Sequence, residues 1–596
     1  MNILRKKILL VGGLGHTDLS GKVPRPGLLM LRQAARAAGH DAEIANYSTS
    51  LMDELYPPQV VERIATMYHR SIKPIVMDGQ NPWLNPLKFF RLISDLKSLK
   101  TIARELASIE KTVYERVGHE ISRQVTTENL DAVGLSLYLG GSTIGSIIIA
   151  DILRQDHPDL PIIFGGPQTT HFAETIYQET HAPTALVLGE GELALVKILN
   201  NLRKGTIANL DQIPNITYRT EDGKIIRTLR QRLPHQEWIK ASCASYEEED
   251  FSGVMRYAFI ETSRGCTYKC HFCTQPLLSG SEIRYLKPAK NIVDEMITIN
   301  EQFGIDHFEF VGSSTPQSQA EEIADELIKR GLKNKFKWVL FMRAVDDRSN
   351  APSTQVLMNK IAGAGALSIF FGVEAADNAT LKKMGKGSKI ETIREAMKAS
   401  VAAGIQTIGS FIYPYPGMPA NEADLIINFL KEVMPLSAPA QALGLLPGTY
   451  DADNAEQIGC EIVYPDPADR QAYLAGEKAK PTITSPEILR YLLTYPLILS
   501  LPMKFWSELP YKINGLTYQQ YISAANKLTN RISRLGILTG FSHSHALIAD
   551  TMKVTPEELS ERMFYCALSG DPKETRKQIN LFNVSSNHNC QQPHNI

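Results

Sequence analysis

Neither sign of charge dominates this sequence, which has 63 Lys and Arg residues against 64 Asp and Glu residues in 596 positions. A net charge of −1 gives no electrostatic footprint for nucleic acid or an anionic membrane surface, so neither is expected as a partner. Long apolar runs are also absent. Residues 492–501 are interrupted by Pro496, and residues 8–11 are too short for the apolar core of a signal peptide. We therefore expect a cytoplasmic protein with no membrane span.

Cysteine is scarce as well. Seven cysteines are too few, and too unevenly placed, for a disulfide scaffold. Three of them, Cys266, Cys270 and Cys273, fall within eight residues, which indicates a metal site in a reducing compartment. Apolar residues make up 43% of the chain and charged residues 21%, a balance that is typical of soluble domains with large cores. At roughly 100–200 residues per domain, the length predicts about three to five structural units.

Residues 1–205 alternate short apolar strands with amphipathic helices, apart from a polar, helical insertion over about residues 50–127. Such alternation predicts right-handed crossovers and a doubly wound parallel sheet. The predicted strands are 7–11, 42–47, 132–139, 161–164 and 184–188. In sheets of this kind, ligands bind beyond the carboxyl ends of the strands. Those ends read Gly12-Gly13-Leu14-Gly15, Gly140-Gly141-Ser142-Thr143, Gly165-Gly166-Pro167-Gln168 and Gly189-Glu190-Gly191-Glu192.

The rest of the chain divides into three parts. Residues 206–251 are predicted to be a linker with a hairpin, which Asp222-Gly223 indicates. A second alternating series covers 252–435, and its roughly five or six β/α units predict a partial (β/α)6 barrel rather than a complete eight-fold one. Its predicted strands are 257–262, 307–311, 337–342, 367–373 and 406–413. Residues 436–596 lose the alternation and are expected to form a mainly helical cap. The predicted fold class is therefore α/β, with a helical C-terminal domain.

The three close cysteines belong to Arg264-Gly265-Cys266-Thr267-Tyr268-Lys269-Cys270-His271-Phe272-Cys273, directly after a predicted strand. Zinc usually takes four N or S ligands in two separated pairs. His271 is available as a fourth ligand, but adjacent ligands on so short a loop would strain a tetrahedral site. Three thiolates instead suit three irons of a 4Fe–4S cluster, leaving the fourth iron open. This spacing, with Phe272 before the last cysteine, resembles the radical S-adenosylmethionine (SAM) superfamily.

The resemblance extends over about residues 252–435 and implies a SAM site at the strand ends. Arg343 is implied to pair with the SAM carboxylate in bidentate fashion; the alternative is an ordinary surface arginine. The segment 311–314 stands where the family has a Gly-Gly-Glu-type segment for the SAM amino group, although this chain has Ser-Ser there. The segments 371–374 and 408–412 resemble those that reach the ribose and flank the adenine. The implied SAM-binding residues are Phe272, Gly312, Ser313, Arg343, Glu374, Ile408 and Ser410.

Residues 5–205 resemble the cobalamin-binding domain found in front of many radical SAM enzymes. The matching segments are Pro26-Gly27-Leu28-Leu29, Ala38-Gly39-His40, Gly165-Gly166-Pro167 and Gly189-Glu190-Gly191-Glu192. A corrinoid lying flat on the sheet edge requires small residues there, and its nucleotide tail would thread near Ser142 and Thr143. The implied contacts are Gly13, Gly141, Ser142, Thr143, Gly165, Gly166, Gln168, Gly189 and Glu190.

Two further observations concern the cobalamin-binding resemblance of this half. The Asp-x-His-x-x-Gly motif, which supplies a histidine ligand to cobalt in some cobalamin proteins, is absent, so we expect no histidine of that motif to bind cobalt. The competing interpretation is a nicotinamide or flavin site, to which Gly13-x-Gly15 is superficially similar. That match lacks the third glycine, since position 18 is Asp18, and it has Asn46 where a ribose-binding acid is usual.

Together the resemblances imply a cobalamin-dependent radical SAM methyltransferase with a 4Fe–4S cluster, SAM and cobalamin as cofactors. The methyl acceptor is implied to be an unactivated carbon, or an sp2 carbon or phosphorus, of a small natural product or peptide. An electron donor such as flavodoxin or ferredoxin is implied as a partner. Two alternatives stay open: a non-methylating relative, such as an oxidative cyclase or ring-contracting enzyme, and a corrinoid-binding sensor or carrier. No residue is singled out as a catalytic acid or base, and the sequence does not identify the substrate.

Overall fold

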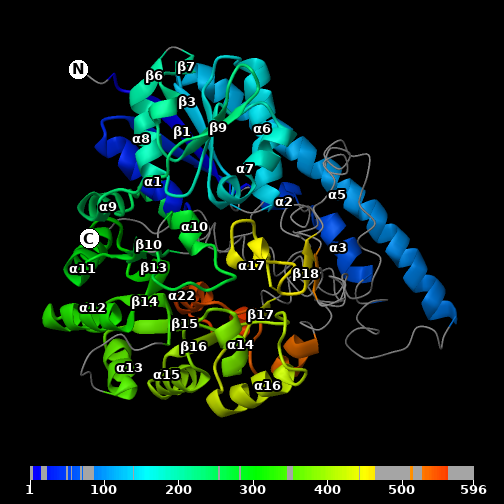
Figure 1. Ribbon diagram of the computed structural model, residues 1–596, viewed down its shortest axis with the longest axis vertical. Helices are drawn as coiled ribbons and strands as arrows, with labels where there is room; N and C mark the ends of the chain where they lie inside the picture. Colours follow the sequence, from blue (N-terminus) through cyan, green and yellow to red (C-terminus); the bar gives the residue numbers. More distant parts are fainter. Residues whose placement is uncertain are drawn as a thin grey trace, which may run out of the picture.

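The computed structural model describes residues 4–14, 23–47, 51–55, 57–67, 70, 86–138, 140–203, 205–252, 256–280, 283–344, 353–441, 443–462, 511–513 and 527–560. They form two large sheets, each with its own helices, and the two units lie one above the other in Figure 1. No helix within these residues is long and apolar enough to span a membrane.

The first sheet has seven strands in the order β2-β1-β3-β4-β5-β8-β9. The strands β1 to β5 run parallel, as the alternation predicted. Their bounds are β1 Lys7–Gly12, β2 Asp41–Asn46, β3 Ala132–Ser136, β4 Ile162–Gly165 and β5 Ala185–Val187. The predicted hairpin forms β8 (Ile216–Arg219) and β9 (Ile225–Arg227), and β8 pairs antiparallel with β5. Residues of the predicted linker therefore extend the first sheet.

Helices cover both faces of this sheet because its strands alternate between two apolar cores. In β1, Ile8 and Leu10 join a core with α1 and α8, whereas Leu9 and Val11 join a core with α5 and α6. The bounds are α1 Pro26–Ala37, α2 Met52–Leu55, α3 Pro58–Met67, α5 Pro86–Thr127, α6 Gly140–Asp156, α7 Pro167–Glu179 and α8 Glu192–Asn201. The predicted helical insertion contains α2, α3 and α5, and α5 packs along α6 and extends away from the sheet (Figure 1).

Six strands form the second sheet, in the order β10-β13-β14-β15-β16-β17, and every neighbouring pair is parallel. This sheet is the partial barrel that the second alternating series predicted. Its strands are β10 Ala258–Glu261, β13 His307–Thr315, β14 Lys337–Met342, β15 Ala366–Glu374, β16 Gln406–Ile412 and β17 Ala440–Gln441. The helices between them are α11 Ala289–Phe303, α12 Gln317–Lys329, α13 Thr354–Gly363, α15 Ile390–Ala402 and α16 Glu422–Val433.

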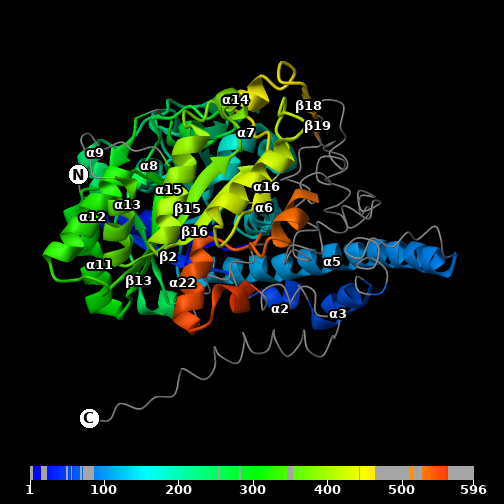
Figure 2. The same ribbon diagram turned by 90° about the horizontal axis from the view of Figure 1, so that it is seen from below.

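The residues after 435 add a strand to the partial barrel and a helix that packs against it. The strand β17 adds to the sheet edge, and helix α22 (His543–Met552) lies against β13, β14 and β15 (Figure 2). His543 contacts one side chain from each of these strands, namely Glu309, Phe341 and Phe370.

The same part of the chain includes α17 (Tyr450–Asp453) and an antiparallel pair, β18 (Cys460–Ile462) and β19 (Tyr511–Ile513). The sequence predicted a mainly helical cap. These strands are too short to give a periodic signal, so the pattern did not reveal them. Residues 463–510 of the predicted cap lie outside the described residues.

Candidate active site

The three close cysteines lie on a loop that begins near the carboxyl end of the first barrel strand. After β10, the strand β11 (Ser263–Arg264) pairs antiparallel with β12 (Tyr285–Leu286) and closes the base of the loop. Gly265 has a φ of +78°, and a Cβ there would lie 2.3 Å from the Ile283 carbonyl oxygen. Only glycine fits this position, so the start of the loop has a fixed shape.

The thiols of Cys266, Cys270 and Cys273 are all free, and burial raises the pKa of Cys273 to about 11. Among the described residues, no three His, Cys, Asp or Glu side chains converge where one metal ion would bind. The His271 ring stacks on Tyr450, with centroids 4.1 Å apart. Three thiolates on one loop are the ligand type of a 4Fe–4S cluster, in which each thiolate attaches to a separate iron.

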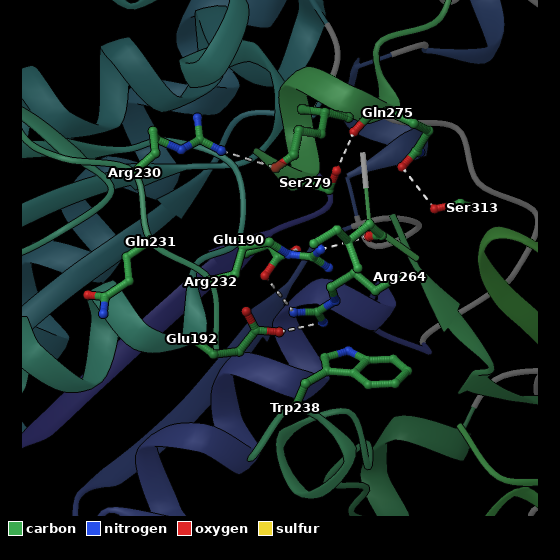
Figure 3. A network of polar contacts seen from close by, with 12 residues as sticks. Glu190, Glu192, Arg230, Gln231, Arg232, Trp238, Arg264, Gln275, Ser279 and Ser313 are labelled. Atoms are coloured by element: carbon green, nitrogen blue, oxygen red, sulfur yellow. Dashed lines mark hydrogen bonds and ion pairs between the residues drawn. The ribbon is translucent and has the colours of Figure 1, made fainter. Parts of the chain in front are cut away.

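Three of the residues predicted to bind SAM lie against this loop. A Cβ on Gly312 would be 2.1 Å from the Ser263 carbonyl oxygen, so the end of β13 touches β11. The Ser313 hydroxyl donates to Gln275 Oε1 at 3.3 Å, at the start of helix α10 (Gln275–Ser279) (Figure 3). Arg343 Nη1 donates to Cys270 Sγ at 3.3 Å. The fold thus brings the ends of two further strands to the cysteine loop.

The other predicted SAM residues have more varied surroundings. Glu374 has a φ of 71°, which is unusual for a non-glycine residue, and its carboxylate accepts from Lys386 Nζ at 2.8 Å in a buried pair. Lys386 Nζ also lies 6.0 Å from the centre of the Phe272 ring. Ile408 is fully buried in the barrel core, and Ser410 is half-buried. The SAM contacts of these residues stay predictions.

Lys386 and Tyr268 are near the cysteines, and sequence reasoning missed both. The Tyr268 ring lies under the Arg343 guanidinium, and the Lys386 carbonyl accepts a hydrogen bond from Arg343. The one local signal was the pair of glycines that flank Lys386, because paired glycines mark a tight backbone approach. A Cβ on Gly385 would in fact lie 2.7 Å from the carbonyl oxygen of Lys269 in the cysteine loop.

The edge predicted to bind cobalamin has open space and a buried acceptor. A Cβ on Gly165 would meet no atom within 4 Å. Gln168 is buried, and its Oε1 has no hydrogen-bond partner within the described part of the chain. A buried acceptor without a partner costs free energy unless a ligand or water satisfies it. Both features fit a corrinoid, whose rim carries amide donors, lying on this edge.

Other residues of the same edge serve the fold itself. Gly166 has a φ of +101°, and a Cβ there would lie 2.6 Å from the Leu137 carbonyl oxygen. Gly13 also has a positive φ, of 76°. Thr143 is fully buried in α6, whose first turn contains Gly141 and Ser142. The structure places all of these at the carboxyl end of the first sheet, and their contacts with cobalamin stay predictions.

Glu190 and Glu192, which follow β5, face the base of the cysteine loop instead of open space. A Cβ on Gly189 would lie 2.3 Å from the carbonyl oxygen of Leu278 in α10, so the two parts of the chain touch here. Glu192 pairs with Arg264 at 2.6 Å, and Glu190 lies 3.7 Å from the same guanidinium (Figure 3). These contacts join the first sheet to the residue two positions before the first cysteine.

Three further side chains, of Glu261, Arg232 and Trp238, complete this buried network. Arg264 Nε pairs with Glu261 at 2.7 Å, and Arg232 Nε pairs with Glu190 at 3.0 Å. Trp238 Nε1 donates to the other side of the Glu261 carboxylate at 3.2 Å. The side chains of Glu190, Glu192, Glu261 and Arg264 are only 7–12% exposed. Charges removed from water to this extent require close partners, so each depends on the others.

The pKa shifts in the network follow from its charges. Burial acts to raise the pKa of Glu192, but the Arg264 guanidinium outweighs it and holds that pKa below its usual range. For Glu190, burial dominates over the more distant Arg264 and raises the pKa to about 7. Glu190 therefore keeps a proton to a higher pH than Glu192 does.

Comparison with known proteins agrees with this geometry. Residues 260–430 match the radical SAM superfamily. An uncharacterized methyltransferase of Pyrococcus horikoshii is 25% identical over 320 residues, which cover 53% of this chain and 67% of that protein. The anaerobic magnesium-protoporphyrin IX monomethyl ester cyclase of Rubrivivax gelatinosus is 25% identical over 306 residues, which cover 49% of this chain and 52% of the cyclase. The chain thus spans about one half to two thirds of the length of these relatives.

The likeness to a solved structure extends over nearly the whole chain. The radical SAM methyltransferase TsrM from Kitasatospora setae, whose structure holds cobalamin and a 4Fe–4S cluster, aligns with a TM-score of 0.60. The alignment covers 94% of this chain and 99% of TsrM, at 14% sequence identity. At that identity the likeness shows a shared fold.

Replacing Arg264 tests the network as a structural joint. We predict that Arg264→Met destabilises the protein by about 3–5 kcal/mol, because Glu192 and Glu261 lose their partner while buried. The measurement is the apparent Tm and the urea midpoint. Arg5→Met is the matched control, because the Arg5–Asp41 pair is largely exposed and should contribute little. Equal, small effects of both substitutions would contradict the buried joint.

The raised pKa of Glu190 predicts a pH dependence of stability. Its native pKa of about 7 lies above the ordinary 4.5, so the native state binds more protons between these values. The stabilisation from Glu190 is therefore complete below about pH 4.5 and is lost as the pH rises to about 7. A glutamine at position 190 does not ionise, so Glu190→Gln should not lose this stability. The apparent Tm of the variant minus that of the native protein should therefore increase from pH 5 to pH 8. Parallel Tm profiles would contradict the prediction.

Proposed function

This chain belongs to the radical SAM superfamily, and we propose that it is a cobalamin-dependent methyltransferase acting on a small-molecule or peptide substrate. One observation carries the proposal. The loop with the three cysteines is joined, through Arg264, to the carboxyl edge of the first sheet, where Glu192 lies. A cluster on the loop and a corrinoid on the edge would therefore border the same space.

The chain's own residues define what each part would hold. Cys266, Cys270 and Cys273 would hold the cluster, and the ends of β13, β14 and β15 would surround SAM. The edge around Gly165 and Gln168 would hold the corrinoid. When bound, these groups supply one-electron cleavage of SAM and methyl transfer through cobalt. An external one-electron donor such as flavodoxin or ferredoxin is part of the proposal.

The protein's contribution is placement and exclusion of water. Gly166 and Gly312 let the backbone of each sheet end approach its neighbour closely. The residues after 435 reach the same region, because His171 Nδ1, in α7, is hydrogen-bonded to the Pro447 carbonyl oxygen at 3.0 Å. The amide of Asp451, in α17, also donates to the carbonyl oxygen of His271 in the cysteine loop. The proposed reaction space is thus bordered by the first sheet, the barrel and the cap, which limits access of water.

A second candidate function is oxidative cyclisation without methyl transfer. It is favoured by the cyclase of Rubrivivax gelatinosus, which is as similar in sequence as the methyltransferase of Pyrococcus horikoshii. A corrinoid sensor or carrier is disfavoured, because such a protein needs no cluster loop. The acceptor atom and the substrate class belong to this proposal and depend on the experiment below.

The two nucleoside products of SAM distinguish methylation from cyclisation. With SAM, a strong reductant and a candidate substrate, methylation of an sp3 carbon should give one 5′-deoxyadenosine and one S-adenosylhomocysteine per product. Direct methylation of an sp2 carbon should give S-adenosylhomocysteine without matching 5′-deoxyadenosine. Chromatography of both nucleosides is the measurement. If substrate is consumed while S-adenosylhomocysteine stays at background, the methyltransferase proposal fails and cyclisation replaces it.

The corrinoid edge is tested by filling its open space. Gly165→Trp should abolish uptake of hydroxocobalamin in equilibrium dialysis, because the side chain would occupy the space beside the edge. Gly165 is the informative position, since a side chain at Gly166 would strike the backbone and disturb the fold. Gly540→Trp is the control, because a Cβ there also meets no atom within 4 Å. Undiminished uptake by Gly165→Trp would place the corrinoid elsewhere.

A further inference from the structure

Arg343 is held directly beside one of the proposed cluster ligands. It follows β14, and its Nη1 donates to Cys270 Sγ at 3.3 Å. A guanidinium is charged at every pH of interest, so this is a charge-assisted hydrogen bond to sulfur. The sequence offered two roles for Arg343, a SAM carboxylate partner and a surface arginine. Its contacts show that it is not an ordinary surface arginine.

Three other groups fix the position of the Arg343 guanidinium. Its carbon lies 3.7 Å from the centre of the Tyr268 ring, which belongs to the cysteine loop itself. Its Nη2 donates to the Lys386 carbonyl oxygen and to the Ser388 hydroxyl, the latter at 3.2 Å. The buried ion pair between Lys386 and Glu374 holds this acceptor segment against β15. The arginine is therefore pre-organised toward Cys270 rather than free to swing away.

These contacts also limit what else Arg343 binds. Both N–H groups of Nη2 are occupied, so the expected end-on bidentate pair with a carboxylate would require one of these two bonds to be released. The Nε is buried and has no hydrogen-bond partner within the described residues, which leaves it as a donor for a ligand. Arg343 is thus able to contact a ligand through Nε while it keeps its bond to the cysteine sulfur.

We propose that Arg343 raises the reduction potential of the cluster bound by Cys266, Cys270 and Cys273. The inference rests on the proposed function, since it requires that cluster. Reduction adds one electron from the external donor and increases the negative charge on the cluster and its thiolates. A positive donor hydrogen-bonded to a ligand sulfur stabilises the reduced form more than the oxidised form. Without Arg343 the cluster should therefore be harder to reduce.

The chain offers a matched control in Arg284. Its guanidinium carbon also lies over the Tyr268 ring, 5.7 Å from the centre, and it is half-buried. Within the described residues no contact of Arg284 with a cysteine is found. Replacing Arg284 removes a positive charge from beside the same loop without removing a hydrogen bond to sulfur. A comparison of the two arginines therefore separates the effect of the hydrogen bond on the midpoint potential from the effect of a nearby positive charge.

The test is the midpoint potential of the reconstituted cluster, measured by EPR at set potentials without SAM. Iron and sulfide are first quantified in the native protein, Arg343→Met, Arg343→Lys and Arg284→Met. The midpoint of Arg343→Met should shift to more negative potential, and that of Arg343→Lys by a smaller amount. The midpoint of Arg284→Met should stay close to the native value. An unchanged midpoint in Arg343→Met, or an equal shift in both methionine variants, would overturn the inference.

The design separates failure of this inference from failure of the proposed function. Absence of cluster iron in the native protein would refute the proposed function itself. If Arg343→Met does not hold a cluster, Arg343→Lys decides, because it keeps the charge but loses the planar donor. A native midpoint in that variant would overturn the inference. If Arg343→Met lowers the affinity for SAM and leaves the midpoint potential unchanged, Arg343 contributes to SAM binding alone. That result would also contradict the inference.

Discussion

The arrangement of this protein depends on one buried arginine. Arg264 lies two residues before the first cysteine of the loop, and its guanidinium contacts Glu192 of the first sheet's edge and Glu261 at the end of β10. Because all three side chains are nearly removed from water, none is stable there without the others. These contacts thus join the two sheets at the point where the cysteine loop begins.

The functional regions follow from this joint. In both sheets the parallel strands end in loops at their carboxyl edges, which is where open α/β sheets and β/α barrels bind ligands. Arg264 holds these two edges together, so groups bound to each would meet between them. The cap adds a third boundary through α17 and the segment that carries Pro447. A radical reaction in a space that excludes water is protected from unwanted hydrogen donors.

Sequence periodicity predicted the elements but not the contacts between distant segments. The bounds of β14 (Lys337–Met342) agree with the predicted strand 337–342, because this buried strand is a short apolar run in the sequence. The two-residue strand β17 gave no pattern, and nothing local indicated that α22 would lie against the barrel strands. The spacing of the three cysteines predicted that the loop binds a 4Fe–4S cluster. Glu190 was expected at a corrinoid, whereas its contacts with Arg232 and Arg264 come from residues 42 or more positions away.

The proposed function requires that the two sheet edges hold cobalamin and the cluster within one shared space. The most direct test is EPR on the full-length protein carrying both bound cob(II)alamin and the reduced cluster, compared with samples carrying each one alone. If the two paramagnets face one another across the joint, the spectrum of the doubly loaded protein should be broadened or split by their interaction. A spectrum equal to the sum of the two separate spectra would contradict the account.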